Sequence, residues 1–280
     1  MGTQINTNVA ALNAHRNLNS TQNALSKSLE KLSSGLRINR AADDAAGLAI
    51  SEGLRSQISG IKVAQRNAQD GISVIQTAEG ALTEVHNILH RMRDLAVQGG
   101  NDSNNTDSRA AITKEADDLS LELARVVGGA NFNGIQLLDG TAGAAGVVTF
   151  QVGAGDTAND SIDVTLADAG ADLGGLDAAG VFDVTDNAAA KGSITAIDTA
   201  ITAISTSRAT LGAAQNRFES TINSLAVAGE NLAAAESRIR DTDMASEMVA
   251  FTRANILSQA GTAMLAQANQ ANQGVLKLLG

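Results

Sequence analysis

Two histidines one helical turn apart are the residues of this chain that most resemble a catalytic metal site. His86 and His90 stand at positions i and i+4 in the string HNILH, the spacing with which zinc peptidases hold a metal on one helix face. In those enzymes a glutamate follows the first histidine and acts as the base, whereas Asn87 stands here. The remaining histidine is His15, and no third ligand is marked. A hydrolase is one hypothesis, but two histidines on a helix surface are the favoured interpretation.

A glycine-containing segment and two acidic pairs could also be read as functional sites. GAGDTA at 153–158 follows the strand-like VVTFQV and resembles a dinucleotide loop, but such a loop must open a helix. NDSIDVTL follows instead, so a β-hairpin is expected. In the pairs Asp43-Asp44 and Asp117-Asp118, helical neighbours would point in different directions, and neither pair has EF-hand spacing. We therefore expect no catalytic, cofactor-binding or metal-binding residues.

The elements that carry these residues are predicted to be mostly helical. The 280 residues include no Pro, Cys, Trp or Tyr and only five Phe, yet 44% are hydrophobic. Small and aliphatic side chains must therefore fill the core, which suits long helices packed side by side. The lack of cysteine excludes disulfides and thiol nucleophiles, and a net charge of −10 argues against a nucleic-acid partner. We expect neither a membrane-spanning segment nor a cleaved secretory signal.

A narrow apolar seam runs through residues 194–239. Fourteen positions alternate three and four residues apart, and off this seam the only large apolar residue is Val227. Such a narrow stripe is typical of a coiled coil. Ten of the fourteen positions carry large apolar residues, namely Ile194, Ile197, Ile201, Ile204, Leu211, Phe218, Ile222, Leu225, Leu232 and Ile239, and the exceptions are Arg208, Gln215, Gly229 and Glu236.

Residues 54–89 carry a matching seam in the N-terminal half. It is interrupted at Gln65, Glu79 and His86. We expect the two long helices to fold back on each other as an elongated rod, with a third helix at 106–127. The apolar seam comprises Leu54, Ile58, Ile61, Ala68, Ile72, Ile75, Leu82 and Leu89, and the third helix is expected to turn Ile112, Leu119, Leu123 and Val126 inward.

An acidic segment separates the two halves. No Lys or Arg occurs between Arg125 and Lys191, a stretch that is also rich in Gly and Ala. We expect a solvated insert of loops and short strands on the outside of the molecule, because so many carboxylates cannot be buried without partners. The segment contains nine aspartates: Asp139, Asp156, Asp160, Asp163, Asp168, Asp172, Asp177, Asp183 and Asp186.

The two ends are predicted to form a second helix pair. Two helices bury only part of their apolar surface, so this pair should be marginal alone and should associate with other copies. The residues predicted to form this self-assembly core are Ile5, Val9, Leu12, Leu18, Leu25, Leu29 and Leu32 at one end, and Met248, Phe251, Ile256, Leu265, Leu276, Leu278 and Leu279 at the other.

Together these patterns predict a mainly α fold: an elongated coiled-coil rod with a small β-hairpin and loop region, whose two termini form a paired-helix core. The predicted divisions are a core helix at 1–43, rod helices and the start of the hairpin at 44–138, the acidic insert at 139–192, a rod helix at 193–240 and a second core helix at 241–280.

Several strings resemble bacterial flagellin. They include NTNVAALNA, LEKLSSGLRINRAADDAAGLAISEGLRSQI, NAQDGISVIQTAEGAL, ANFNGIQLLDG, FQVGAG and LGAAQNRFESTINSLAVAGENLAAAESRIRDTDMASEMVAFTRANILSQAGTAMLAQANQ, in the order of that family. The resemblance implies a subunit of the extracellular flagellar filament, exported unfolded and polymerised at the filament tip. It implies that the end helices line the filament core, that the outer domain is absent or reduced to a loop, and that a switch hairpin lies around 131–155.

The resemblance also implies partners. These are other copies of the chain, a flagellar export chaperone, the filament cap and the hook-associated junction proteins. Flagellins are also bound by an innate-immune receptor of the Toll-like class, and the matching positions here are Arg91, Leu95 and Glu115, with Asp94 where the family usually has Glu. A minor hook–filament junction protein is the alternative, but the intact central motifs favour the main filament subunit.

Overall fold

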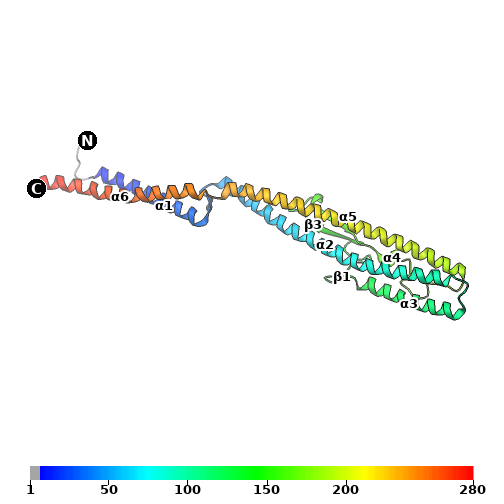
Figure 1. Ribbon diagram of the computed structural model, residues 1–280. Coiled ribbons are helices and arrows are strands. Elements are labelled where there is room, and N and C mark those ends of the chain that lie inside the picture. Colours follow the sequence, from blue (N-terminus) through cyan, green and yellow to red (C-terminus); the bar gives the residue numbers. More distant parts are fainter. Residues whose placement is uncertain (1–6, 280) are drawn as a thin grey trace. The chain divides into compact units, whose positions relative to one another are not determined.

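Helices make up most of the described chain. The computed structural model describes residues 7–279, and the side-chain surroundings of residues 7–270. The helices are α1 (Val9–Ser34), α2 (Ala45–Gly99), α3 (Thr106–Gly129), the short α4 (Ala169–Asp172), α5 (Asn187–Arg240) and α6 (Met244–Leu279) (Figure 1). Two antiparallel strand pairs accompany them: β1 (Asn131–Phe132) with β2 (Ile135–Gln136), and β3 (Val147–Gln151) with β4 (Ser161–Thr165). The prediction of a mainly α fold is confirmed.

The chain divides into two compact units, which are described separately. The middle unit is Ile58–Glu230, and the terminal unit comprises the chain up to Gln57 and from Asn231 onward. Each of the long helices α2 and α5 therefore contributes to both units.

In the middle unit α2 and α5 lie antiparallel, side by side (Figure 1). Glu79 on α2 pairs with Arg208 on α5, and Arg93 on α2 pairs with Asp198 on α5. The residue numbers therefore increase along α2 in the direction in which they decrease along α5, so the two helices are antiparallel. All fourteen predicted seam positions between 194 and 239 are buried or half-buried, which confirms the seam itself. The expectation of a narrow stripe is wrong, because a further row of small residues is also buried, including Ala190, Ser193, Ala200 and Ala214.

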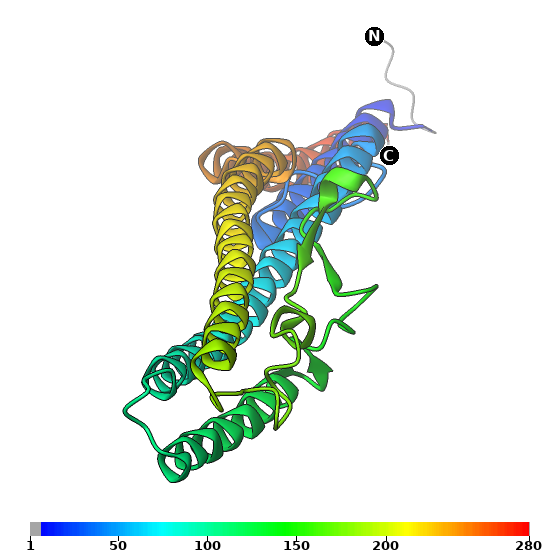
Figure 2. The same cartoon turned by 90° about the vertical axis from the view of Figure 1, so that its right-hand side faces the viewer.

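The acidic insert covers that extra row. Its apolar residues, among them Ile162, Val164, Leu173 and Phe182, are buried in the same core as α2, α3 and α5, and Figure 2 shows the segment in green along these helices. The expectation of a solvated insert is therefore wrong for its buried apolar residues. The strand β4 alternates, with Ile162 and Val164 inward and Asp163 exposed, so the carboxylates reach water while the apolar partners pack.

Between β3 and β4, the segment that resembled a dinucleotide loop is the turn of a hairpin. The strands pair in register from Val147–Thr165 to Gln151–Ser161, which confirms the hairpin prediction. A Cβ on Gly153 would lie 1.9 Å from Oδ1 of Asp160, so the glycine is needed for the close approach of this carboxylate. Asp160 in turn accepts hydrogen bonds from the hydroxyl of Thr157 at 2.6 Å and its backbone N–H at 3.1 Å.

An aromatic contact fastens the hairpin to the helix pair. The rings of Phe150 on β3 and Phe218 on α5 meet edge to face, with centroids 5.4 Å apart, and Phe218 is fully buried. Gly71 on α2 provides the space, because a Cβ there would lie 2.9 Å from Cζ of Phe218.

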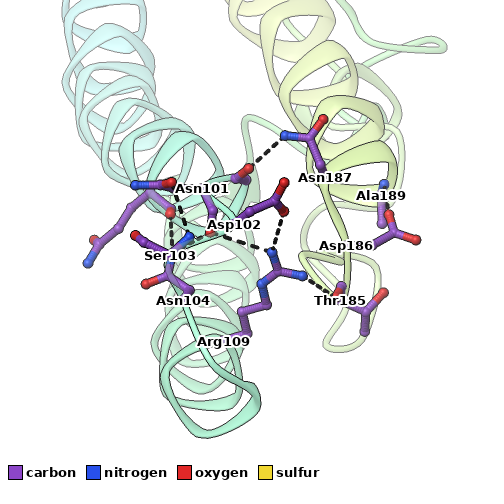
Figure 3. Close-up of polar contacts among 11 residues, drawn as sticks. Asn101, Asp102, Ser103, Asn104, Arg109, Thr185, Asp186, Asn187 and Ala189 are labelled. Atoms are coloured by element: carbon purple, nitrogen blue, oxygen red, sulfur yellow. Dashed lines mark hydrogen bonds and ion pairs between the residues drawn. The ribbon is translucent and has the colours of Figure 1, made fainter.

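At the α2–α3 turn, polar contacts tie the turn to the start of α5 (Figure 3). Arg109 donates to the carbonyl of Thr185 and pairs with Asp102 at 3.2 Å. The side-chain amide of Asn187 donates to the carbonyl of Gly100 at 2.7 Å, and Asp186 caps α5 by accepting from the N–H of Ala189 at 2.7 Å. These polar contacts add to apolar packing at the same place, where Val184 and Ala190 are fully buried close to Gly99 and Gly100.

In the terminal unit, the chain leaving α1 is fastened to the connection between α5 and α6. Gly35 ends α1 in the left-handed conformation, with φ of 74°, and Leu36 forms a β-bridge with Asp241. Arg37 donates to the carbonyl of Ile239 at 2.6 Å, and Ile38 is buried.

Candidate self-assembly surface

In the terminal unit α1 and α6 form an antiparallel pair with a seam of mostly small residues. Asn8 donates to the carbonyl of Ala268 at 2.9 Å, and Lys31 lies 4.0 Å from Glu247 at the other end. The buried and half-buried positions recur at heptad spacing. They are Ala11, Ala14, Leu18, Thr21, Leu25, Ser28 and Leu32 on α1, and Glu247, Phe251, Ala254, Ser258, Gly261, Leu265 and Ala268 on α6.

Most large apolar side chains of the pair lie outside this seam. For example, the side chains of Leu12 and Ile256 are exposed to solvent, at 61% and 60% respectively. We call these side chains the open surface. It comprises Val9, Leu12 and Leu29 on α1, and Met244, Met248, Val249, Ile256, Leu257 and Met264 on α6.

The described part of the terminal unit has almost no apolar core. Only Ile38 and Ala254 are buried apolar residues there, whereas the middle unit contains every other such residue of the described chain. Burial of one large aliphatic side chain stabilises a protein by about 1.5–3 kcal/mol. The side chains of the open surface are not buried within the chain, so they do not contribute this stabilisation to the monomer. The surface is therefore suited to burial against further chains.

The structure divides the predicted assembly residues into two groups. Leu18, Leu25, Leu32, Phe251 and Leu265 lie on the seam within the chain. Val9, Leu12, Leu29, Met248 and Ile256 lie on the open surface. Ile5 lies outside the described residues, and so do the side-chain surroundings of Leu276, Leu278 and Leu279.

Sequence reasoning missed Val249 and Leu257 on the open surface. Each directly follows another large apolar residue, Met248 or Ile256. Neighbours on a helix point about 100° apart, and together the two pairs line one shallow groove on α6. These two adjacent apolar pairs were the signal for a second contact surface on α6.

The predicted receptor residues lie in the middle unit. Arg91 on α2 donates from Nε to Oε1 of Glu115 on α3 at 2.8 Å, and both side chains are about half exposed. Leu95 is in the core, with 1% of its surface exposed. The structure thus joins Arg91 to Glu115 at the surface and places Leu95 beneath it.

The histidine pair lies in the middle of α2. Nε2 of His86 and Nε2 of His90 are 2.9 Å apart. Burial lowers the pKa of His86, with smaller contributions from His90 and Arg208. Within the described residues no group of three or more potential metal-binding side chains occurs.

The acidic pairs hold backbone in place. Asp43 accepts from the N–H groups of Asn39 and Arg40, contacts that, with nearby lysines, lower its pKa despite some desolvation. Asp44 accepts from the N–H of Gly47 at 2.9 Å.

In the second acidic pair, Asp117 and Asp118 contact different partners. Asp117 accepts from the N–H of Gly180 at 2.9 Å. Asp118 pairs with Lys114 at 2.9 Å. Neither acidic pair converges on a common point.

Comparison with known proteins identifies the family. The sequence model of the bacterial flagellin N-terminal helical region matches residues 5–143, and that of the C-terminal helical region matches residues 194–279. A flagellin of Halalkalibacterium halodurans is 54% identical over 275 residues, which cover 98% of this chain and 99% of the relative. The chain belongs to the bacterial flagellin family.

Two further proteins place this flagellin among its relatives. The flagellar filament 33 kDa core protein of Treponema phagedenis is 46% identical over 283 residues, covering 98% of this chain and 99% of that protein. The crystal structure of Bacillus cereus flagellin is similar with a TM-score of 0.50 and 36% identity, covering 61% of this chain and 94% of that one. Among the described residues of this flagellin, no helix combines the length and the apolar character needed to span a membrane.

Proposed function

We propose that this flagellin is the repeating subunit of an extracellular bacterial flagellar filament and that the open surface joins one copy to the next. The observation that carries the proposal is the near absence of buried apolar residues in the described part of the terminal unit, beside ten exposed large ones, nine of which form the open surface. The relatives named flagellin and flagellar filament core protein, aligned over almost their whole length, support it. No observation favours the alternative of a hook–filament junction protein.

Within this proposal, residues 1–43 and 241–280 line the filament core, and residues 44–138 and 193–240 form the surrounding rod. The insert, residues 139–192, replaces an outer domain and exposes its carboxylates. Its nine aspartates, in a stretch that has no Lys or Arg between Arg125 and Lys191, support that placement. Family membership supports export in an unfolded state, and as partners an export chaperone, the filament cap and the hook-associated junction proteins.

The protein acts by assembly and not by catalysis in this proposal. The acidic pairs that could have served as catalytic groups hold backbone N–H groups or a lysine. The glycine segment is a hairpin turn. Known flagellins are structural proteins, which supports the same conclusion.

A Toll-like receptor of an animal host would meet Arg91 and Glu115 as an ion pair on the surface of the monomer. Leu95 would act from below by supporting the helix that carries Arg91, since its own side chain is buried. Reporter-cell signalling should fall for Arg91→Ala, while Leu95→Ala should lower the stability of the monomer as well.

Polymerisation of purified variants tests the assembly proposal. The double variant Ile256→Ser/Leu257→Ser removes two apolar side chains of the open surface and should fail to form filaments in light scattering and electron microscopy. The matched control is Val181→Ser, which changes a 47% exposed apolar residue of the insert and should polymerise normally. Circular dichroism should show unchanged helicity for both monomers, and normal filaments from the double variant would refute the proposal.

A further inference from the structure

The assembly function makes no use of His86 and His90, whose ring nitrogens nevertheless face each other. Their Nε2 atoms are 2.9 Å apart, and the rings meet at 82° with centroids 4.5 Å apart. Two nitrogens that bind one ion at about 2.0–2.1 Å lie roughly 2.9–3.4 Å apart when the angle between the bonds is between 90° and tetrahedral. The observed separation corresponds to an angle near 90°, the lower end of this range.

We propose that His86 and His90 form a two-histidine clamp for a divalent transition-metal ion such as Zn²⁺ or Ni²⁺. Imidazole nitrogen is a ligand that these ions prefer, whereas Mg²⁺ and Ca²⁺ prefer oxygen. Water molecules complete the coordination, because His90 is exposed and no third protein ligand is grouped with the pair among the described residues. This site is not a catalytic centre, since Asn87 replaces the base of the peptidase motif.

The helix holds the two rings in position before an ion arrives. Val85 and Leu89, next to the histidines in sequence, are completely buried, and this fixes the rotation of α2 about its axis. His86 is half-buried in the seam between α2 and α5. A clamp on a rigid helix loses little conformational freedom on binding, and its second nitrogen binds at high effective concentration.

The charges around the clamp tolerate a cation. Arg208 on α5 lies close enough to influence His86, but its guanidinium is paired with Glu79 at 2.7 Å. On α2 itself, Arg91 next to His90 is paired with Glu115, and Asp94 adds a negative charge one turn further on.

Titration of the full-length monomer with zinc tests the clamp without any mutation. In NMR spectra of the three histidine rings, Zn²⁺ should shift or broaden the signals of His86 and His90 together and leave His15 unchanged, whereas Mg²⁺ should affect none of them. If zinc leaves the signals of His86 and His90 unmoved, or moves only one of them, the proposal is overturned.

Calorimetry of variants provides a second, independent test. The wild-type monomer should bind one Zn²⁺ at this pair, and His90→Gln, a change at an exposed position, should weaken binding about 100-fold. His15→Gln is the matched control and should bind as the wild type does. Equal affinity of His90→Gln and wild type would contradict the clamp whatever the state of polymerisation, so its failure is separate from that of the assembly proposal.

Discussion

Arg208 on α5 pairs with Glu79 on α2, with 2.7 Å between the guanidinium and carboxylate atoms and about a third of each side chain exposed. Both residues interrupt otherwise apolar seams. A polar pair inside a coiled coil fixes the register of its helices, because any shift separates the two charges. We infer that this pair sets the alignment that also brings Gly71 opposite Phe218.

Breaking this pair on one side should be costly. Arg208→Met leaves the Glu79 carboxylate in the seam without its partner, and we expect the free energy of unfolding to fall by about 1–3 kcal/mol. The double variant Glu79→Leu/Arg208→Met should recover most of this loss, because an apolar pair needs no desolvation of charge. Urea unfolding of the monomers measures both effects.

The pair Arg93–Asp198 is the control for this prediction. It joins the same two helices, but its side chains are 41% and 49% exposed. Arg93→Met should therefore change the stability by less than about 1 kcal/mol. Equal losses for Arg93→Met and Arg208→Met would show that position in the seam does not matter.

Glycine at position 71 should be required for the aromatic contact between hairpin and helices. A Cβ at Gly71 would lie 2.9 Å from the Phe218 ring, so Gly71→Ala should destabilise the monomer by about 1–3 kcal/mol through overpacking. Gly80 on the same helix has open space at its Cβ position, and Gly80→Ala should instead stabilise by about 0.5–1 kcal/mol. Thermal unfolding that shifts both variants in the same direction would exclude this explanation.

The sequence predicts the long helices and their seam well, because large apolar residues at heptad spacing can bury themselves in only one way. It does not reveal the buried row of Ser193, Ala200 and Ala214, because small residues contribute little to an apolar pattern. These small side chains allow the insert to pack close to α5. The sequence suggests a solvated insert because its aspartates are more conspicuous than the alternation of Ile162 and Val164, which is the usual pattern of a half-buried strand.

The sequence predicts the assembly residues as one set, because it does not show which side of each terminal helix faces its partner within the chain and which side faces another copy. The structure shows that the large residues at the seam, such as Leu25 and Leu265, are supplemented by small ones, and that Leu12, Leu29 and Ile256 point elsewhere. The sequence does not predict the pairing of Glu79 with Arg208 either. It shows that a polar residue interrupts each seam, but it does not show that the two interruptions lie opposite each other.

The hairpin turn should depend on the charge of Asp160. Hydrogen bonds from the hydroxyl and backbone N–H of Thr157 hold the pKa of this carboxyl below its ordinary value. Because the folded pKa is lowered, the stabilisation is present above the unfolded pKa of about 3.9 and is lost as the pH falls through the folded value. Thr157→Val removes the hydroxyl donor and should raise the pKa of Asp160 towards its ordinary value.

Carbon-detected NMR titration of the Asp160 carboxyl measures this shift directly. The difference in stability between Thr157→Val and wild type should also shrink as the pH is lowered, because the protonated carboxyl gains little from the hydroxyl. An unchanged titration midpoint in the variant would contradict the assigned cause of the shift.

Labelling of single cysteines tests the central claim, burial of the open surface between copies, most directly. The chain contains no cysteine, so Ile256→Cys and Val181→Cys each introduce one thiol, at positions 60% and 47% exposed in the monomer. Both should react rapidly with a maleimide before polymerisation. After polymerisation, labelling at position 256 should become much slower, while labelling at position 181 should keep its monomer rate. Rapid labelling at position 256 in intact filaments would contradict the claim that this surface joins the subunits.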